Sequence, residues 1–166
     1  MMEALKAGKK APSVELSTTA GHHFSLAEAL RKGPVVLAFF KISCPVCQFT
    51  FPYLERIFQR TKGTNISVVG VSQNNLKDTQ FFARQYGVTF PVVLDDPDRY
   101  EVSNAYGLTT VPTIFLISQD GTIEVSCVGF VKDDLLDIAK RLGDATKAPA
   151  VPVFAKNEDV PAFRAG

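Results

Sequence analysis

Apolar residues are arranged along the chain in two alternating patterns. Uninterrupted apolar runs with many β-branched side chains occupy residues 34–40 and 66–71, and such runs are typical of strands that are buried on both faces. Residues 45–60 lie between them and carry Phe49, Tyr53 and Ile57 at helical spacing. The pattern therefore predicts a strand, a helix and a second strand in this part of the chain.

The same reading extends over the flanking segments. Upstream it predicts a strand at 13–16, a hairpin turn at 20–23 and a short helix that starts at the capping-box sequence 25–28 and ends at 33–34. Downstream it predicts helices at 75–86, 99–106 and 132–142, and strands at 91–94, 113–117 and 122–128, the last two joined by a turn at 119–121. Alternating strands and helices followed by a hairpin indicate an α/β sheet that is covered on both faces.

The periodic pattern stops after the last predicted helix. Pro149, Pro152 and Pro161 interrupt the remaining residues. We therefore expect one domain over residues 1–143 and a tail over 144–166 that is extended or partly disordered. Apolar residues at 151, 153, 154 and 163 would also allow the tail to lie along the domain.

Composition narrows the classes of partner. The 166 residues are 46% hydrophobic and 21% charged, with a formal net charge of +1, so no strongly basic face is indicated and we expect no nucleic-acid partner. No apolar stretch approaches the roughly 18 residues of a membrane helix, so we expect no membrane insertion. The first ten residues carry lysines without the apolar core of a secretory signal. We expect a cytoplasmic monomer.

The strongest chemical signal is Cys44-Pro45-Val46-Cys47, which directly follows the 34–40 strand. Proline fits the first helical position, so Pro45 makes Cys44 the capping residue, where backbone N–H groups and the helix dipole favour a thiolate. Cys47 would lie one turn deeper. The spacing predicts a redox-active Cys44–Cys47 disulfide, with Cys44 attacking a partner disulfide and Cys47 resolving the mixed disulfide.

A zinc site is the main alternative for such a pair of cysteines. A structural zinc needs four ligands, and the chain offers only Cys127, His22 and His23 besides, on different predicted elements. We therefore predict no metal and no cofactor. Cys127 is expected to be a small hydrophobic core residue.

Val111-Pro112-Thr113 stands at the start of the 113–117 strand. A proline at the first residue of a strand is structurally tolerated, which is the simplest reading. The functional reading is a cis peptide beside the dithiol, with flanking backbone left free to pair with a substrate strand. The combination with an upstream pair of cysteines favours the functional reading.

These features resemble the thioredoxin-fold superfamily, and within it the TlpA-like thiol–disulfide oxidoreductases and AhpC/TSA-related redoxins, over about residues 8–143. The matching features are the strand at 35–40, the Cys44–Cys47 motif, Pro52, the segments 87–91 and 106–107, Val111-Pro112-Thr113 and the turn at 120–121. The resemblance implies a thioredoxin-like fold with a central mixed sheet, an N-terminal hairpin and an inserted strand–helix unit over 73–94. It also implies a cis Val111–Pro112 bond packed against the cysteines.

The sequence departs from the family at three places around the cysteines, two of which usually carry the residues that handle the proton of Cys47. Ser43 replaces the usual Trp, Ala38 replaces a buried Asp, and Gln73 stands where several TlpA-like reductases carry an acid. Lys41 is the nearest charged candidate to stabilise a thiolate, and it reads equally well as a surface lysine. Val46 offers neither charge nor hydrogen bond. A cytoplasmic setting favours a reductant of protein disulfides that is recharged by an upstream thiol reductant.

Two other functions stay open at this point. The first is a peroxiredoxin-like thiol peroxidase that uses Cys47 with Cys44 resolving, although Cys44 replaces the hydroxyl residue of the peroxidase motif. The second is a non-catalytic binding module of the same fold. The acidic run at 95–98 lacks the spacing of a cation loop and is interpreted as a solvated turn that caps the next helix.

Overall fold

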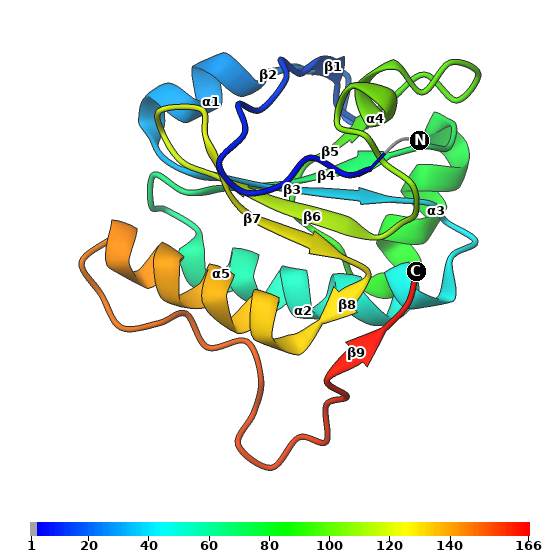
Figure 1. Ribbon diagram of the computed structural model, residues 1–166. Coiled ribbons are helices and arrows are strands. Elements are labelled where there is room, and N and C mark those ends of the chain that lie inside the picture. Colours follow the sequence, from blue (N-terminus) through cyan, green and yellow to red (C-terminus); the bar gives the residue numbers. More distant parts are fainter. Residues whose placement is uncertain (1–2) are drawn as a thin grey trace.

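A mixed sheet of five strands runs through the middle of the molecule in the computed structural model, which describes residues 3–166 (Figure 1). Its strand order is β5-β4-β3-β6-β7. Strands β3, β4 and β5 are parallel, whereas β6 and β7 are antiparallel to their neighbours. The five strands are β3 (Val35–Phe40), β4 (Ser67–Ser72), β5 (Val92–Leu94), β6 (Thr113–Ile117) and β7 (Ile123–Val128).

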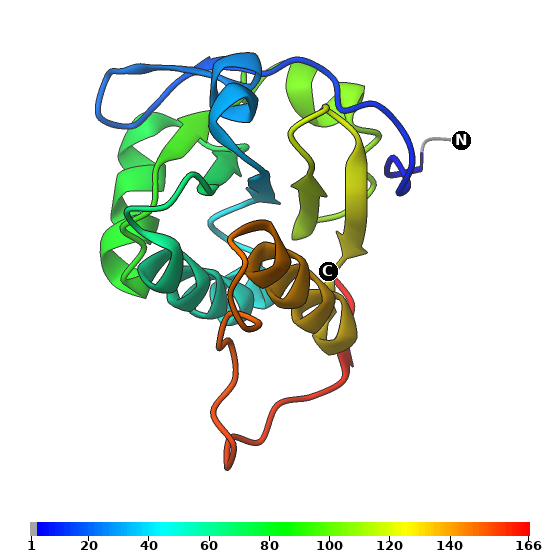
Figure 2. The ribbon, with the colours of Figure 1, turned by 90° about the vertical axis from the view of Figure 1, so that its left-hand side faces the viewer.

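Helices cover both faces of the sheet (Figure 2). One face packs against α2 (Pro45–Thr61), α3 (Leu76–Tyr86) and α5 (Lys132–Ala145). The other packs against α1 (Leu26–Lys32), α4 (Glu101–Ala105) and the N-terminal segment. Every residue of β3 is buried, which explains why its sequence lacks the alternation of a half-exposed strand.

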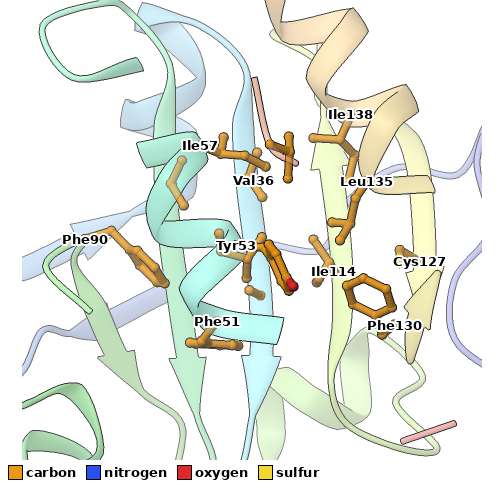
Figure 3. Packing of buried hydrophobic residues seen from close by; sticks show 14 of the residues in the cluster. Val36, Phe51, Tyr53, Ile57, Phe90, Ile114, Cys127, Phe130, Leu135 and Ile138 are labelled. Atoms are coloured by element: carbon orange, nitrogen blue, oxygen red, sulfur yellow. The ribbon is translucent and has the colours of Figure 1, made fainter. Parts of the chain in front are cut away.

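The larger core lies between the sheet and helices α2 and α5. Val36 and Ile114 project from the sheet toward Tyr53 and Ile57 of α2 and Ile138 of α5 (Figure 3). Cys127 belongs to the same cluster and is fully buried. The prediction that Cys127 is a hydrophobic core residue is therefore confirmed.

The additions to the sheet match the predicted ones. An antiparallel hairpin of β1 (Glu15–Ser17) and β2 (His23–Ser25) precedes the sheet, and the inserted unit supplies α3 and the edge strand β5. Asn75 caps α3 at its start and Gly87 ends it in the left-handed conformation, which glycine adopts without strain. Within the described residues, no helix has the length and apolar content needed to span a bilayer.

The segment after the predicted domain follows a defined path along the body. Helix α5 continues to Ala145, past the predicted end at 142. Val153 and Val160 are buried in the larger core, and the two-residue strand β9 (Phe163–Arg164) pairs with β8 (Phe130–Val131). The tail is thus extended for most of its length and packed on the domain through Val151, Val153, Phe154 and Val160, whereas Phe163 is exposed.

Candidate active site

Three strand ends meet at one edge of the sheet. Ser72 at the end of β4 pairs with Phe40 at the end of β3, and the preceding Phe39 pairs with Thr113 at the start of β6. The antiparallel pairing of β6 therefore brings the segment before Thr113 beside the residues that follow Phe40. This register alone places Cys44 and Val111, far apart in sequence, at the same edge.

Cys44 is the N-cap residue of α2, as predicted. Its backbone is extended, and its Sγ accepts a hydrogen bond from the backbone N–H of Cys47 at 3.1 Å. The Cys44 thiol donates to the carbonyl oxygen of Val111 at 3.4 Å. Pro45 occupies the first turn of the helix, where its missing N–H leaves no hydrogen bond unmade. Cys44 is partly exposed, so a partner sulfur can approach it.

Cys47 lies one turn deeper and is fully buried. Burial, and secondly the hydrogen bond with Cys44, raise the pKa of the Cys47 thiol far above its ordinary value, because a buried anion loses its hydration. Both cysteines are free thiols in the structure. The pair therefore combines an accessible sulfur with a protonated, sheltered one.

The peptide bond between Val111 and Pro112 is cis. Pro112 and Thr113 are buried, and the Thr113 hydroxyl donates to the carbonyl of Thr110 at 2.9 Å. Gly129 donates its N–H to the carbonyl of Pro112 at 2.8 Å. These contacts hold the Val111 carbonyl against Cys44, which is the arrangement that the sequence resemblance implied.

A cleft of about 470 Å³ opens beside Cys44, and we call it the Cys44 cleft. Among the predicted site residues, Lys41, Pro45 and Val111 line it with Cys44. Val46 instead packs against the larger core, and Ser43 is exposed outside the lining. The Lys41 ammonium lies 5.6 Å from the centre of the Tyr100 ring, a cation–π distance.

A polar chain that starts from Gln73 and Ser103 in the lining of the Cys44 cleft was missed by the sequence analysis. Gln73 donates from Nε2 to Ser103 Oγ at 2.9 Å, and Ser103 Oγ donates to Asp95 Oδ2 at 2.7 Å. Asp95 is only 1% exposed, so the interpretation of its turn as solvated is wrong for this residue. The capping part of that prediction is confirmed, because Asp95 also accepts from the backbone N–H groups of Val102 and Ser103.

Two further polar side chains fix the loop before Cys44. Asn74 Oδ1 accepts from the N–H of Ile42 at 2.9 Å, and Gln48 Nε2 donates to the Ile42 carbonyl at 2.9 Å. Asn74 is the second residue after the end of β4. Its position just past the end of a strand was the sequence signal that could have identified it. The loop geometry that presents Cys44 therefore depends on one amide from the segment after β4 and one from α2 itself.

The residues weighed as zinc ligands do not come together. His22 and His23 are exposed on the β1–β2 hairpin, where His23 Nε2 lies 2.7 Å from Glu15 Oε2. Cys127 is buried in the core, and burial raises the pKa of its thiol to about 12. Across residues 3–166, the structure contains no group of three or more His, Cys, Asp or Glu side chains suited to hold a metal.

Comparison with known proteins agrees with this geometry. The sequence profile of the AhpC/TSA family matches residues 7–126. The chain belongs to the AhpC/TSA family. The thiol–disulfide oxidoreductase ResA of Geobacillus thermodenitrificans is 33% identical over 135 residues, which cover 80% of this chain and 75% of the relative. ResA of Bacillus subtilis is also 33% identical, over 81% of this chain and 74% of its own length.

Solved structures show the same fold. A putative thiol:disulfide interchange protein DsbE from Chlorobium tepidum matches with a TM-score of 0.74 and 27% identity, over 85% of this chain and 98% of that one. A putative protein disulfide isomerase from Bacteroides thetaiotaomicron matches with a TM-score of 0.80 at 23% identity, over 89% and 95%. The predicted thioredoxin-like fold and TlpA-like redoxin resemblance are confirmed. This AhpC/TSA family member is a thiol–disulfide oxidoreductase.

Proposed function

We propose that Cys44 and Cys47 form the redox centre and that the protein reduces disulfides of protein substrates. The observation that carries this assignment is the contrast within the pair: Cys44 is partly exposed at a helix start in the Cys44 cleft, whereas Cys47 is fully buried beneath it. Only Cys44 can meet a protein disulfide, and only Cys47 is placed to finish the reaction.

The cycle transfers two electrons from the dithiol to the substrate. The Cys44 thiolate attacks one sulfur of the substrate disulfide, that S–S bond breaks, and one substrate thiolate leaves as a mixed disulfide forms. Cys47 then loses its proton and attacks Cys44 Sγ. The Cys44–Cys47 disulfide forms, and the second substrate sulfur leaves as a thiolate and takes up a proton. An upstream thiol reductant restores the dithiol.

The second step, the attack of Cys47 on the mixed disulfide, is favoured by the closeness of the two cysteines. The Cys47 thiol and Cys44 Sγ already interact in the reduced protein, so resolution is intramolecular and proceeds at high effective concentration. The raised pKa of Cys47 keeps this sulfur protonated in the reduced protein.

The peroxidase alternative fits the geometry less well. It requires a Cys47 thiolate that peroxide can reach, whereas Cys47 is 0% exposed and its pKa is raised. No arginine is among the described residues that line the Cys44 cleft. A non-catalytic binding module would leave the similarity to named oxidoreductases without a reason.

The decisive experiment traps the mixed disulfide. We expect Cys47→Ser to accumulate a covalent adduct with a disulfide-containing protein such as insulin, visible on non-reducing gels and by mass spectrometry and reversed by dithiothreitol. Cys44→Ser should form no adduct, and neither variant should turn over. Cys127→Ala is the matched control, because it removes the third cysteine and should keep wild-type turnover.

Two outcomes would contradict the proposal. An adduct on Cys47 in the Cys44→Ser variant would reverse the roles of the two sulfurs. Rapid peroxide consumption by the reduced protein, together with failure to reduce insulin, would favour the peroxidase instead.

The same proposal includes the direction of the redox reaction, the cellular compartment and the oligomeric state. A reductant works where glutathione and thioredoxin systems keep thiols reduced, so we propose that the protein acts in the cytoplasm. We also propose that it is a monomer. Equilibration of the Cys44–Cys47 couple in glutathione buffers should give a potential near the thioredoxin value of about −270 mV rather than the oxidising value of about −120 mV. Cell fractionation and light scattering test the compartment and the monomer.

A further inference from the structure

The last residues of the chain return to the active-site edge of the molecule. Strand β9 pairs antiparallel with β8, and Lys132 donates its N–H to the carbonyl of Ala162 at 2.9 Å. The Arg164 guanidinium lies 4.2 Å from the centre of the Phe49 ring on α2. Figure 1 shows this red segment ending beside the start of α2. We call residues 162–166 the tip.

The tip ends on the backbone that faces Cys44. Gly166 lines the Cys44 cleft together with Cys44 and Val111. Its Cα packs so closely on the Val111 carbonyl oxygen that an added Cβ would overlap that oxygen, and the same Cβ would lie 2.9 Å from Thr110 Oγ1. The end of the tip therefore fits here only without a side chain.

A second glycine makes room for the tip from the domain side. A Cβ on Gly129 would lie 2.7 Å from the carbonyl oxygen of Arg164, closer than a Cβ approaches an oxygen in ordinary packing. Gly129 also has a φ of 79°, in the region that favours glycine. The tip therefore approaches the domain closely at two glycines, Gly166 against Val111 and Gly129 against Arg164.

The covered backbone is the part that a protein substrate needs. The Val111 carbonyl accepts the Cys44 thiol hydrogen bond, so any extended chain that brings its sulfur to Cys44 must run beside Val111. Extended peptides commonly bind by pairing their backbone with free backbone groups of the partner protein. Gly166 already occupies one side of that backbone.

We propose that the tip is a built-in competitor of extended protein substrates for the Val111 side of the Cys44 cleft. Protein disulfides reach Cys44 when the tip moves aside, whereas small disulfides react past it. This inference rests on the proposed function of Cys44. A tip that occupies the cleft nine-tenths of the time lowers kcat/KM for a competing substrate about tenfold, because only the open fraction reacts.

The test compares two substrates on tip variants of the 166-residue protein. Deletion of residues 162–166 should raise kcat/KM for insulin reduction several-fold, toward about tenfold for a mostly occupied cleft. The rate with hydroxyethyl disulfide, which has no peptide backbone, should stay within about twofold. Gly166→Val keeps the chain length and should act in the same direction, because its side chain collides with Val111.

The matched control is Asn157→Val, which adds the same side chain at an exposed tail position away from the cleft and should change neither rate. Thermal unfolding of each variant verifies that the domain stays folded. Unchanged or slower insulin reduction in both tip variants would overturn the proposal, as would an equal gain with both substrates. If the wild type did not reduce hydroxyethyl disulfide, or reduced it equally well without Cys44, the proposed function itself would be contradicted.

Discussion

At the scale of single residues, two identical thiols acquire different properties from their surroundings. Cys44 faces N–H groups and the cleft, whereas Cys47 is enclosed by the larger core. The sequence could predict this difference, because Pro45 fixes the start of the helix and the helix fixes which sulfur is deeper. It could not predict the Gln73–Ser103–Asp95 chain, because these partners lie up to 30 residues apart and meet only through the sheet.

Removal of the buried Asp95 carboxylate should destabilise the protein. Asp95→Ala leaves the backbone N–H groups of Val102 and Ser103 and the Ser103 hydroxyl without their acceptor, and buried unsatisfied donors cost about 1–3 kcal/mol each. We expect a loss of at least about 2 kcal/mol in the free energy of unfolding by urea denaturation. Asp98→Ala, in the same acidic run but exposed, should change it by less than about 0.5 kcal/mol.

The buried thiols also predict how stability depends on pH. The thiol pKa values of Cys47 and Cys127 are raised above the ordinary value of 9.0, so above pH 9 the unfolded chain releases protons that the folded protein retains. Stability of the reduced protein is therefore fully present below pH 9 and falls as the pH rises. The slope is about 1.4 kcal/mol per pH unit for each thiol.

Cys127→Ala separates this contribution from the general effect of alkali. The free energy of unfolding of this variant is measured in urea between pH 9 and 11, with reductant present. It should decline with pH less steeply than that of the wild type, by about 1.4 kcal/mol per pH unit. An identical slope in both proteins would show that Cys127 ionises equally in the folded and unfolded states.

At the scale of elements, the helices and long strands were predictable and the shortest pieces were not. Strands β8 and β9 contain two residues each, too few to show alternation. The predicted end of α5 at 142 is wrong, because the glycine that follows, Gly143, serves packing rather than termination. It is buried within the helix, and an added Cβ would overlap the carbonyl of Pro149.

This reading of Gly143 predicts the sign of a substitution. Alanine at an interior helical position is normally more stable than glycine by about 1 kcal/mol. Gly143→Ala should nevertheless lower the free energy of unfolding, because the Cβ must push back the backbone at Pro149. Urea denaturation measures the change, with Lys140→Ala on the exposed side of α5 as a near-neutral control. A more stable Gly143→Ala protein would show that the 148–149 segment yields freely.

At the scale of the whole molecule, the order of elements predicted the sheet, and the sheet brought together two of the predicted site residues, Cys44 and Val111. The path of the tail could not be predicted in this way. Besides the buried Val153 and Val160, the tail is held by an ion pair between Arg56 and Glu158, which are 102 residues apart. The pattern of apolar and polar residues does not predict such a contact, because a single ion pair forms only once the fold has placed both segments side by side.

The Arg56–Glu158 anchor predicts when the tail comes loose. Glu158 Oε1 and Oε2 accept from the two terminal nitrogens of Arg56 at 2.6 and 2.8 Å, and these hydrogen bonds lower the pKa of the Glu158 carboxyl to about 2. A lowered pKa means that the anchor is fully present above the ordinary value of 4.5 and is lost as the pH falls toward 2. Glu158→Gln should release the tail already at neutral pH.

Limited proteolysis measures this release. Trypsin should cut the Glu158→Gln protein at the exposed Lys156 faster than the wild type at neutral pH, because cleavage requires the tail to leave the surface. The wild type, tested with pepsin, should become more sensitive in the tail between pH 4.5 and 2, while the variant shows a smaller change over that range. Asp159→Asn, at an exposed neighbouring position, is the control and should match the wild type. Equal trypsin rates for wild type and Glu158→Gln would mean that Val153 and Val160, buried in the core, hold the tail without the ion pair.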